Sequence, residues 1–236
     1  MNLNQQINQL DWQEICHSLQ DKGYALVSNF LSDSQCQSLI KRYDNESEYR
    51  KTVDMKRYRF GFGEYKYWDY PLPDMVKNLR EGLYPHLAPV ANAWMQCLNL
   101  ETRFPQHLPS LTSQCEANGQ MKPTPLILKY PQTGFNTLHQ DLYGEVYFPI
   151  QVAIVLSQKD EDYQGGEFVM TRQIPRAQSQ AIVLTPDRGD MIIFTTNFKP
   201  EQGVRGYYRV NMKHGISEVL SGERYAMGII FHDAAS

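Results

Sequence analysis

The sequence has few cysteines, and their spacing argues against two classes of small scaffold. Four of the 236 residues are cysteines, and they form neither a Cys-x-x-Cys pair nor a tight cluster: Cys16, Cys36, Cys97 and Cys115. A zinc ribbon needs closely spaced thiolates, and a disulfide framework needs a dense set of cysteines in a short secreted chain. We therefore predict buried, reduced thiols.

Targeting segments are also lacking. Residues 1–6 have neither the basic start nor the apolar core of a secretory signal peptide. No uninterrupted apolar run approaches the roughly 20 residues that a membrane span needs. These absences predict a cytoplasmic protein with no membrane segment.

The chain has no large excess of charge of either sign. Its formal net charge is −3, which argues against bulk electrostatic binding to nucleic acid but allows a local basic patch. With 42% hydrophobic residues, a chain of this length can bury a sizeable core. We predict a single domain over residues 1–236, without an obligate protein partner.

The first half of the chain begins with helix signals. Residues 11–20 carry apolar side chains at helical spacing, and Gly23 suits a left-handed cap after them. Residues 24–27 predict a short strand. The stretch 31–33 supplies an N-cap for a second helix.

The next elements of this half are less regular. Residues 74–98 keep helical spacing, but Pro85 and Pro89 predict a kinked helix or two short ones. Residues 103–122 are rich in turn formers and predict an irregular connection.

Residues 49–70 interleave aromatic rings with positive charges. Six basic residues against three acidic ones give this stretch a charge of +3; the basic ones are Arg50, Lys51, Lys56, Arg57, Arg59 and Lys66. Rings with cations between them can stack nucleobases and neutralise phosphates. The alternative is a hairpin or lid that packs its rings on the fold while its charges face water, with Gly61 and Gly63 as a flexible turn.

Short strands separated by turn signals dominate residues 121–236. We expect strands at 126–130, within 146–156, from 168, at 181–184, at 191–194, at 207–212 and at 225–231. The continuous apolar run 152–156 predicts a strand covered on both faces. The pattern predicts a mainly β fold, an antiparallel jelly roll, with residues 1–120 as a helical and aromatic-basic support.

Three residues of this half form a candidate metal site. His139 and Asp141 stand at positions that share a face in an extended chain, and His214 follows 214 − 141 = 73 residues later. Two imidazoles and one carboxylate leave other metal positions open, which is the ligand set of non-heme Fe(II) oxygenases. Arg224, 224 − 214 = 10 residues further on, is then free to hold an acid.

This order and spacing resembles the Fe(II)/2-oxoglutarate-dependent dioxygenases. That family has a double-stranded β-helix fold, an H-x-D…H metal triad and a basic residue about ten positions after the last histidine. The chain is similar to a bacterial prolyl-hydroxylase-like subgroup whose family label suggests oxidative removal of methyl groups from nucleic acids. The likeness is carried by residues 139–145, 165–168, 175–179, 189–190 and 214–233.

The resemblance implies Fe(II) held by the three ligands, 2-oxoglutarate as co-substrate and O2. Arg224 would bind the distal carboxylate of 2-oxoglutarate, and Tyr130, nine positions before His139, would donate its hydroxyl to the same group. Where many relatives have serine two positions after the arginine, this chain has Ala226. The implied reaction is hydroxylation, or demethylation of an N-methyl group. Nucleobase, protein side chain and small metabolite stay open as substrates.

A geometric condition follows for the segment between His214 and Arg224. A plain hairpin at residues 221–222 would pair Arg224 near Val219, roughly 16 Å along the ladder from His214. That separation does not suit a ligand of five carbons. We expect the connection to cross between the sheets of a sandwich, so that Arg224 lies on the wall facing His214.

A non-oxidative function is the alternative. The same fold and ligands could hold zinc for hydrolysis, with Glu145 as the nearby general base, or serve as a binding module without turnover. Tyr143 and Glu145 are also candidates for substrate contacts. His232 is a competing ligand, although its position beside Asp233 fits neither ligand spacing.

Overall fold

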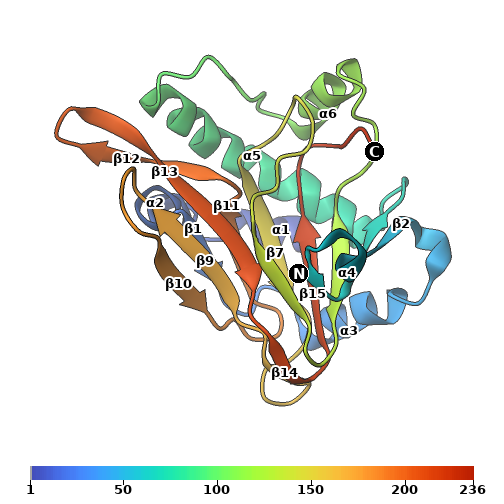
Figure 1. Cartoon of the computed structure of the whole chain (residues 1–236). Coiled ribbons are helices and arrows are strands. Elements are labelled where there is room, and N and C mark those ends of the chain that lie inside the picture. The colour runs from blue at the N-terminus through green and yellow to red at the C-terminus, as the bar shows by residue number, and fades with distance from the viewer. Residues whose placement is uncertain (1) are drawn as a thin grey trace.

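Two β-sheets face each other in the computed structural model, which describes residues 2–236 (Figure 1). The first sheet has seven strands in the order β1 (Tyr24–Val27), β11 (Met191–Thr195), β7 (Ile150–Val155), β15 (Arg224–Ile229), β5 (Leu126–Tyr130), β4 (Glu64–Trp68) and β2 (Tyr49–Asp54). The second has six, namely β10 (Gln180–Leu184), β9 (Phe168–Gln173), β13 (Gly206–Ile216), β6 (Phe135–His139) and β3 (Gly61–Phe62) in order, with β12 (Phe198–Gly203) also paired to β13. The predicted mainly β jelly roll is confirmed.

Most helices cover the outer face of the seven-stranded sheet. They are α1 (Leu3–Asn8), α2 (Trp12–Lys22), α3 (Asp33–Arg42), α5 (Asp74–Cys97) and α6 (Leu108–Ala117), whose apolar side chains join the main core. The 3-10 helix η1 (Glu46–Glu48) and α4 (Met55–Tyr58) are short elements on either side of β2. Figure 1 shows α5 crossing behind this sheet, where its apolar residues join the main core. Within residues 2–236, no helix has the length and apolar character to cross a membrane.

Side chains of the central strands alternate between two buried environments. On β11, Met191 and Ile193 pack in the core shared with the helices, whereas Ile192 and Phe194 pack toward the six-stranded sheet. The strand β7 lies between β11 and β15 in the same sheet. The prediction that the run 152–156 forms a strand covered on both faces is therefore confirmed.

The first two predicted helices are confirmed together with their caps. The carboxylate of Asp11 accepts a hydrogen bond from the Glu14 backbone N–H, and Gly23 ends α2 in the left-handed conformation. Ser32 caps α3 in a capping box with Gln35.

The rest of the first half departs from the predictions at two points. Of the two forms predicted around Pro85 and Pro89, the pair of short helices is wrong, because the region forms one helix, α5. Burial of Leu83, Tyr84 and Leu87 against the sheet compensates for the backbone hydrogen bonds that the prolines lack. The predicted irregular connection 103–122 contains α6, where Pro109 occupies the first turn, a position that needs no backbone N–H.

The aromatic-basic stretch 49–70 is part of both sheets. Its strands β2 and β4 extend the seven-stranded sheet beside β5, while β3 pairs with β6 of the other sheet. The helix α4 connects β2 to β3. Much of the segment is therefore framework, and only α4 and its neighbours project from it.

The segment after His214 crosses between the sheets, as predicted. β13 carries His214 in the six-stranded sheet, and β15 carries Arg224 in the seven-stranded one. Between them, β14 (Val219–Gly222) pairs with β8 (Tyr163–Gly165) in a separate two-stranded sheet. The two residues thus lie on facing walls.

All four cysteines are free thiols. Cys36 and Cys115 are buried, and Cys16 and Cys97 are half-buried. Burial raises the pKa of the Cys36 thiol to about 11. The prediction of reduced thiols without a disulfide framework is confirmed, whereas full burial holds for only two of them.

The buried His232 predicts a specific pH dependence of stability. Its Nδ1 accepts a hydrogen bond from the Phe148 backbone N–H, and burial, helped by the charge of Arg80, lowers its pKa to about 4. Between pH 4 and pH 6.5 the unfolded chain therefore binds a proton that the folded chain does not, so stability falls with falling pH. In His232→Asn, the Asn Oδ1 can accept the same hydrogen bond but does not titrate. The decrease in the free energy of unfolding from pH 6.5 to pH 4 should therefore be smaller by about 3 kcal/mol than in the parent. Urea unfolding measured across the window tests this, and equal pH slopes in the two proteins would contradict it.

Candidate functional site

The two sheets enclose a cavity of about 250 Å³. Four of its lining residues carry an imidazole or a formal charge, namely His139, Asp141, His214 and Arg224. Aromatic and aliphatic side chains supply most of the remaining wall, among them Phe60, Tyr65, Tyr67, Leu126, Leu128, Tyr143, Phe168 and Phe194. The sequence-predicted site residues, including Tyr130, all line this cavity.

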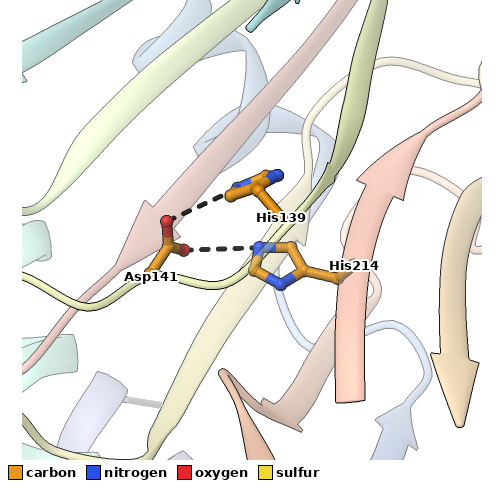
Figure 2. Close-up of side chains that lie close together, drawn as sticks. All are labelled: His139, Asp141 and His214. Atoms are coloured by element: carbon orange, nitrogen blue, oxygen red, sulfur yellow. Dashed lines mark ion pairs between the residues drawn. The ribbon is translucent and has the colours of Figure 1, made fainter. Parts of the chain in front are cut away.

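Strand register brings the two histidines together. His214 on β13 pairs directly with His139 on β6, and the ring centroids lie 4.3 Å apart. Asp141 follows β6 and turns its carboxylate toward both rings (Figure 2). Its Oδ1 lies 3.4 Å from His139 Nε2 and its Oδ2 lies 3.3 Å from His214 Nε2.

The backbone beside His214 departs from regular pairing. A register shift separates His214 from Ile216, and Gly215 lies between them. A Cβ at Gly215 would come within 2.6 Å of the carbonyl oxygen of Asn136. Glycine at this position therefore permits the close approach of β13 and β6 that puts the two imidazoles side by side.

Hydrogen bonds hold the donors in place. The Tyr143 hydroxyl donates to Oδ1 of Asp141 at 2.8 Å, and Gln151 Nε2 donates to Oδ2 at 2.8 Å. His139 Nδ1 lies 2.7 Å from the carbonyl oxygen of Thr137. A proton on Nδ1 satisfies that carbonyl and leaves the lone pair of Nε2 free for a metal.

The electrostatics of the three donors are coupled. Burial on its own would raise the pKa of Asp141, but hydrogen bonds and charge attraction from His139 and His214 hold that pKa well below its usual range. Burial lowers the pKa of His214, and the neighbouring His139 lowers it further. Burial also acts to lower the pKa of His139, but Asp141 outweighs it, so the net pKa is raised.

These residues fit a divalent metal ion. One ligand atom from each of the three residues lies within 4.8 Å of the others. The set comprises an ionised carboxylate and two imidazoles, one of which is biased toward the neutral form. Such a set suits Zn²⁺ or Fe²⁺ and leaves further coordination positions open.

Arg224 lies in the opposite wall and lacks a counter-charge. Its side chain is buried, with the residue 1% exposed, and within residues 2–236 no carboxylate pairs with it. Its Nε and Nη1 atoms have no hydrogen-bond partner in this part of the chain. An uncompensated buried charge is costly, so these donors fit an anionic ligand such as a carboxylate.

Tyr130 accompanies Arg224 in the same wall. The two residues are direct partners across β5 and β15, and the guanidinium carbon lies 5.8 Å from the tyrosine ring centroid. Burial raises the pKa of Tyr130 to about 12, while Arg224 and Asn136 act to lower it. The hydroxyl is thus a neutral hydrogen-bond donor beside a fixed positive charge.

Gly166 makes room for the Arg224 side chain. Its φ is +60°, and a Cβ at this position would lie 2.9 Å from Arg224 Cδ and 3.0 Å from Val219 Cγ2. The Gly-Gly pair at residues 165–166 therefore has a packing reason next to the site.

Of the other candidates, Glu145 and His232 lie outside the cavity lining and Tyr143 lies within it. Glu145 is exposed and is not among the cavity-lining residues, so the base that a hydrolase needs is absent from its expected place. His232 is buried and bonded to the Phe148 backbone, outside the group of potential ligands. Tyr143, a candidate for substrate contact, lines the cavity and also holds Asp141.

The sequence did not predict that Gln151, Tyr65 and Tyr67 belong to the site. Gln151 is a polar residue directly before the apolar run 152–156, and a buried amide in such a strand is itself a signal of a polar partner. The two tyrosines alternate with Lys66 on β4, so that period-2 spacing aims both toward the cavity.

Comparisons with known proteins point in one direction. The model of a family described as an oxygenase catalysing oxidative methylation of damaged DNA matches residues 63–234. Uncharacterized proteins from two strains of Mycobacterium tuberculosis are 46% identical to this chain over 165 residues, which cover 70% of it and 71% of each relative.

Solved structures share the fold at low sequence identity. A prolyl-4-hydroxylase of Pseudomonas putida superposes with a TM-score of 0.55 at 12% identity, covering 94% of this chain and all of that one (100%). A Trichoplax adhaerens prolyl hydroxylase, solved with a peptide fragment of a hypoxia inducible factor, gives 0.56 at 15% identity, covering 98% and 92%. A 2OG-Fe(II) oxygenase family oxidoreductase of Burkholderia pseudomallei gives 0.53 at 14% identity, covering 97% and 94%.

The hydrogen bonds to Asp141 predict how metal affinity depends on its neighbours. In Tyr143→Phe and Gln151→Leu, the carboxylate loses one of its two fixed donors, so affinity for Mn²⁺ or Co²⁺ should fall by about tenfold in each. Anaerobic isothermal titration calorimetry measures this. Tyr207→Phe, which removes an exposed hydroxyl outside the cavity, is the control and should bind like the parent. Unchanged affinity in both cavity variants would contradict the prediction.

Proposed function

The chain belongs to this oxygenase family, whose model spans residues 63–234, and on that premise we propose that it hydroxylates or oxidatively demethylates its substrate. The reaction would consume 2-oxoglutarate and O2 and release succinate and CO2. The family makes the protein an oxidoreductase. Family, fold and the His-Asp-His group together support Fe(II), 2-oxoglutarate and O2 as its cofactors.

The observation that carries the proposal is the unpaired Arg224 facing the three donors across one cavity. A metal site alone would suit a hydrolase or a binding module equally well. Within residues 2–236 the buried guanidinium has no ion-pair partner, so it additionally calls for an acid, and a dicarboxylate offers one acidic group for each wall of the cavity. Glu145 lies outside the cavity lining, which counts against hydrolysis.

The five predicted site residues have distinct roles in this proposal. His139, Asp141 and His214 would hold the iron, which when bound supplies oxidising chemistry with O2. Asp141 keeps its negative charge because its pKa is low, although the residue is buried. Arg224 and Tyr130 would orient 2-oxoglutarate through its distal carboxylate.

A modified nucleobase is the substrate that we propose. The family description names damaged DNA, and the free part of the cavity wall combines aromatic and aliphatic side chains with a few neutral polar ones, among them Asn136 and Gln140, and has no further charged residue. Such a wall suits a flat, neutral ring. The Trichoplax neighbour was solved with a peptide, but at 15% identity that likeness concerns the fold. A cytoplasmic location and a single domain over residues 1–236 stay predictions.

The cofactor assignment predicts a visible charge-transfer band when Fe(II) and then 2-oxoglutarate are added without oxygen. The band should form in the parent and be lost in His139→Ala. In Arg224→Gln, half-saturation should need about 100-fold more 2-oxoglutarate, because a buried charge pair is broken. Anaerobic absorption titration gives both results.

Lys199→Gln is the matched control for Arg224→Gln, because Lys199 is a buried cation outside the cavity and is paired with Glu201. This variant should titrate like the parent. If no band forms in the parent, or if Arg224→Gln binds 2-oxoglutarate as tightly as the parent does, the proposed function is wrong.

Tyr130 allows a finer test of the co-substrate site. Removing one hydrogen bond to a charged group in Tyr130→Phe should raise the half-saturating 2-oxoglutarate concentration by about tenfold, less than the change at Arg224. Tyr163→Phe is the control, because its ring centroid also lies 5.7 Å from the Arg224 guanidinium carbon but the residue does not line the cavity. Equal effects of the two substitutions would remove Tyr130 from the site.

A further inference from the structure

An aromatic pair projects from the protein at the edge of the cavity. Tyr58, the last residue of α4, and Phe60 are 48% and 46% exposed. Their rings are stacked, with centroids 5.6 Å apart and an interplanar angle of 18°. Exposed apolar side chains that adjoin one another, rather than scattered ones, can mark a site of interaction.

Unpaired positive charges lie on the chain segment that carries this pair. Lys51, Lys56, Arg57 and Arg59 are exposed, and none has an ion-pair partner within residues 2–236. The Arg57 guanidinium carbon lies 5.7 Å from the centroid of the Tyr58 ring. The nearby Asp54 is engaged as the N-cap of α4, where it accepts from the Lys56 backbone N–H.

The remaining cations of the stretch 49–70 differ in this respect. Arg50 donates to the carbonyl oxygen of Pro123 and lies 4.5 Å from the Tyr67 ring centroid. Lys66 is buried and pairs with Glu46. The free charges are thus confined to β2, α4 and the cap residue of α4.

The aromatic pair is connected to the metal donors. Phe60 lines the cavity, and its carbonyl oxygen accepts hydrogen bonds from both the backbone N–H and the hydroxyl of Thr137, each at 2.8 Å. The carbonyl oxygen of the same Thr137 contacts His139 Nδ1. A ligand stacked on Phe60 is therefore positioned at the cavity entrance.

We propose that Tyr58, Phe60 and the four free cations form a docking surface for single-stranded DNA. This inference rests on the proposed function and adds the strand that presents the base. The stacked rings take an unpaired base next to the reacting one, and the cations lie along the phosphates. Duplex DNA does not fit this mode, because its bases are already stacked and the enclosed cavity admits only a base that has left the helix.

The aromatic ring of Tyr58 can be tested without touching the cavity, because Tyr58 does not line it. With a labelled thymidine single strand of roughly 12 nucleotides, Tyr58→Ala should lose about tenfold in affinity and Tyr58→Trp should retain parental affinity. Fluorescence anisotropy on the full chain measures this. Equal binding by Tyr58→Ala and the parent, or tighter binding of the parent to duplex than to single strand, would overturn the proposal.

The charges are tested by the salt dependence of the same binding. The double variant Arg57→Gln/Arg59→Gln should bind more weakly, with a slope of log affinity against log salt that is shallower by about 1. Arg176→Gln/Arg205→Gln removes the same charge from exposed turns away from α4, between β9 and β10 and between β12 and β13. This control should match the parent. If both double variants lose affinity equally, binding is diffuse and the docking surface is wrong.

The charge-transfer band separates this inference from the proposed function. A band in the parent without any selective binding of single-stranded DNA leaves the oxygenase assignment standing and overturns the docking surface. Selective binding that depends on Tyr58, in a protein that forms no band, supports the surface and overturns the proposed function.

Discussion

The pairing of His214 with His139 across β13 and β6 is the contact on which the candidate site depends. Antiparallel partners share a face, so this one register brings both rings into the space between the sheets. A slip of a single residue would turn one ring outward. Gly215, Gln151 and Tyr143 all serve this arrangement, the first by letting the strands approach and the others by orienting Asp141.

The opposite wall of the cavity carries a buried charge that lowers the stability of the empty protein. Within residues 2–236, the buried Arg224 has no ion-pair partner, and its Nε and Nη1 atoms lack the hydrogen bonds that would replace their lost hydration. A folded protein tolerates such a group where a ligand supplies the missing charge. The two walls thus belong to one site, although nine residues of chain, including β14 of a separate two-stranded sheet, lie between His214 and Arg224.

Patterns that depend on local chemistry could be predicted from the sequence, and patterns that depend on tertiary packing could not. The ligand spacing, the caps at Ser32 and Gly23 and the crossing of the chain before Arg224 follow from residue type and geometry. The strand β12 was missed because Pro200 argues against a strand, yet β12 pairs with β13 alone, and such an edge position tolerates proline. Gln151 became a site residue only once folding placed it beside Asp141.

The two hydrogen bonds that Thr137 donates to Phe60 connect the proposed docking surface to a metal donor. Thr137 contacts the docking surface on one side and the His139 ring on the other. If the proposed docking surface holds a DNA strand, ordering of Phe60 would also order this imidazole, and the binding of nucleic acid and of metal would be linked. Because such linkage is reciprocal, the metal would strengthen the hold on DNA by the same factor by which DNA strengthens the hold on the metal.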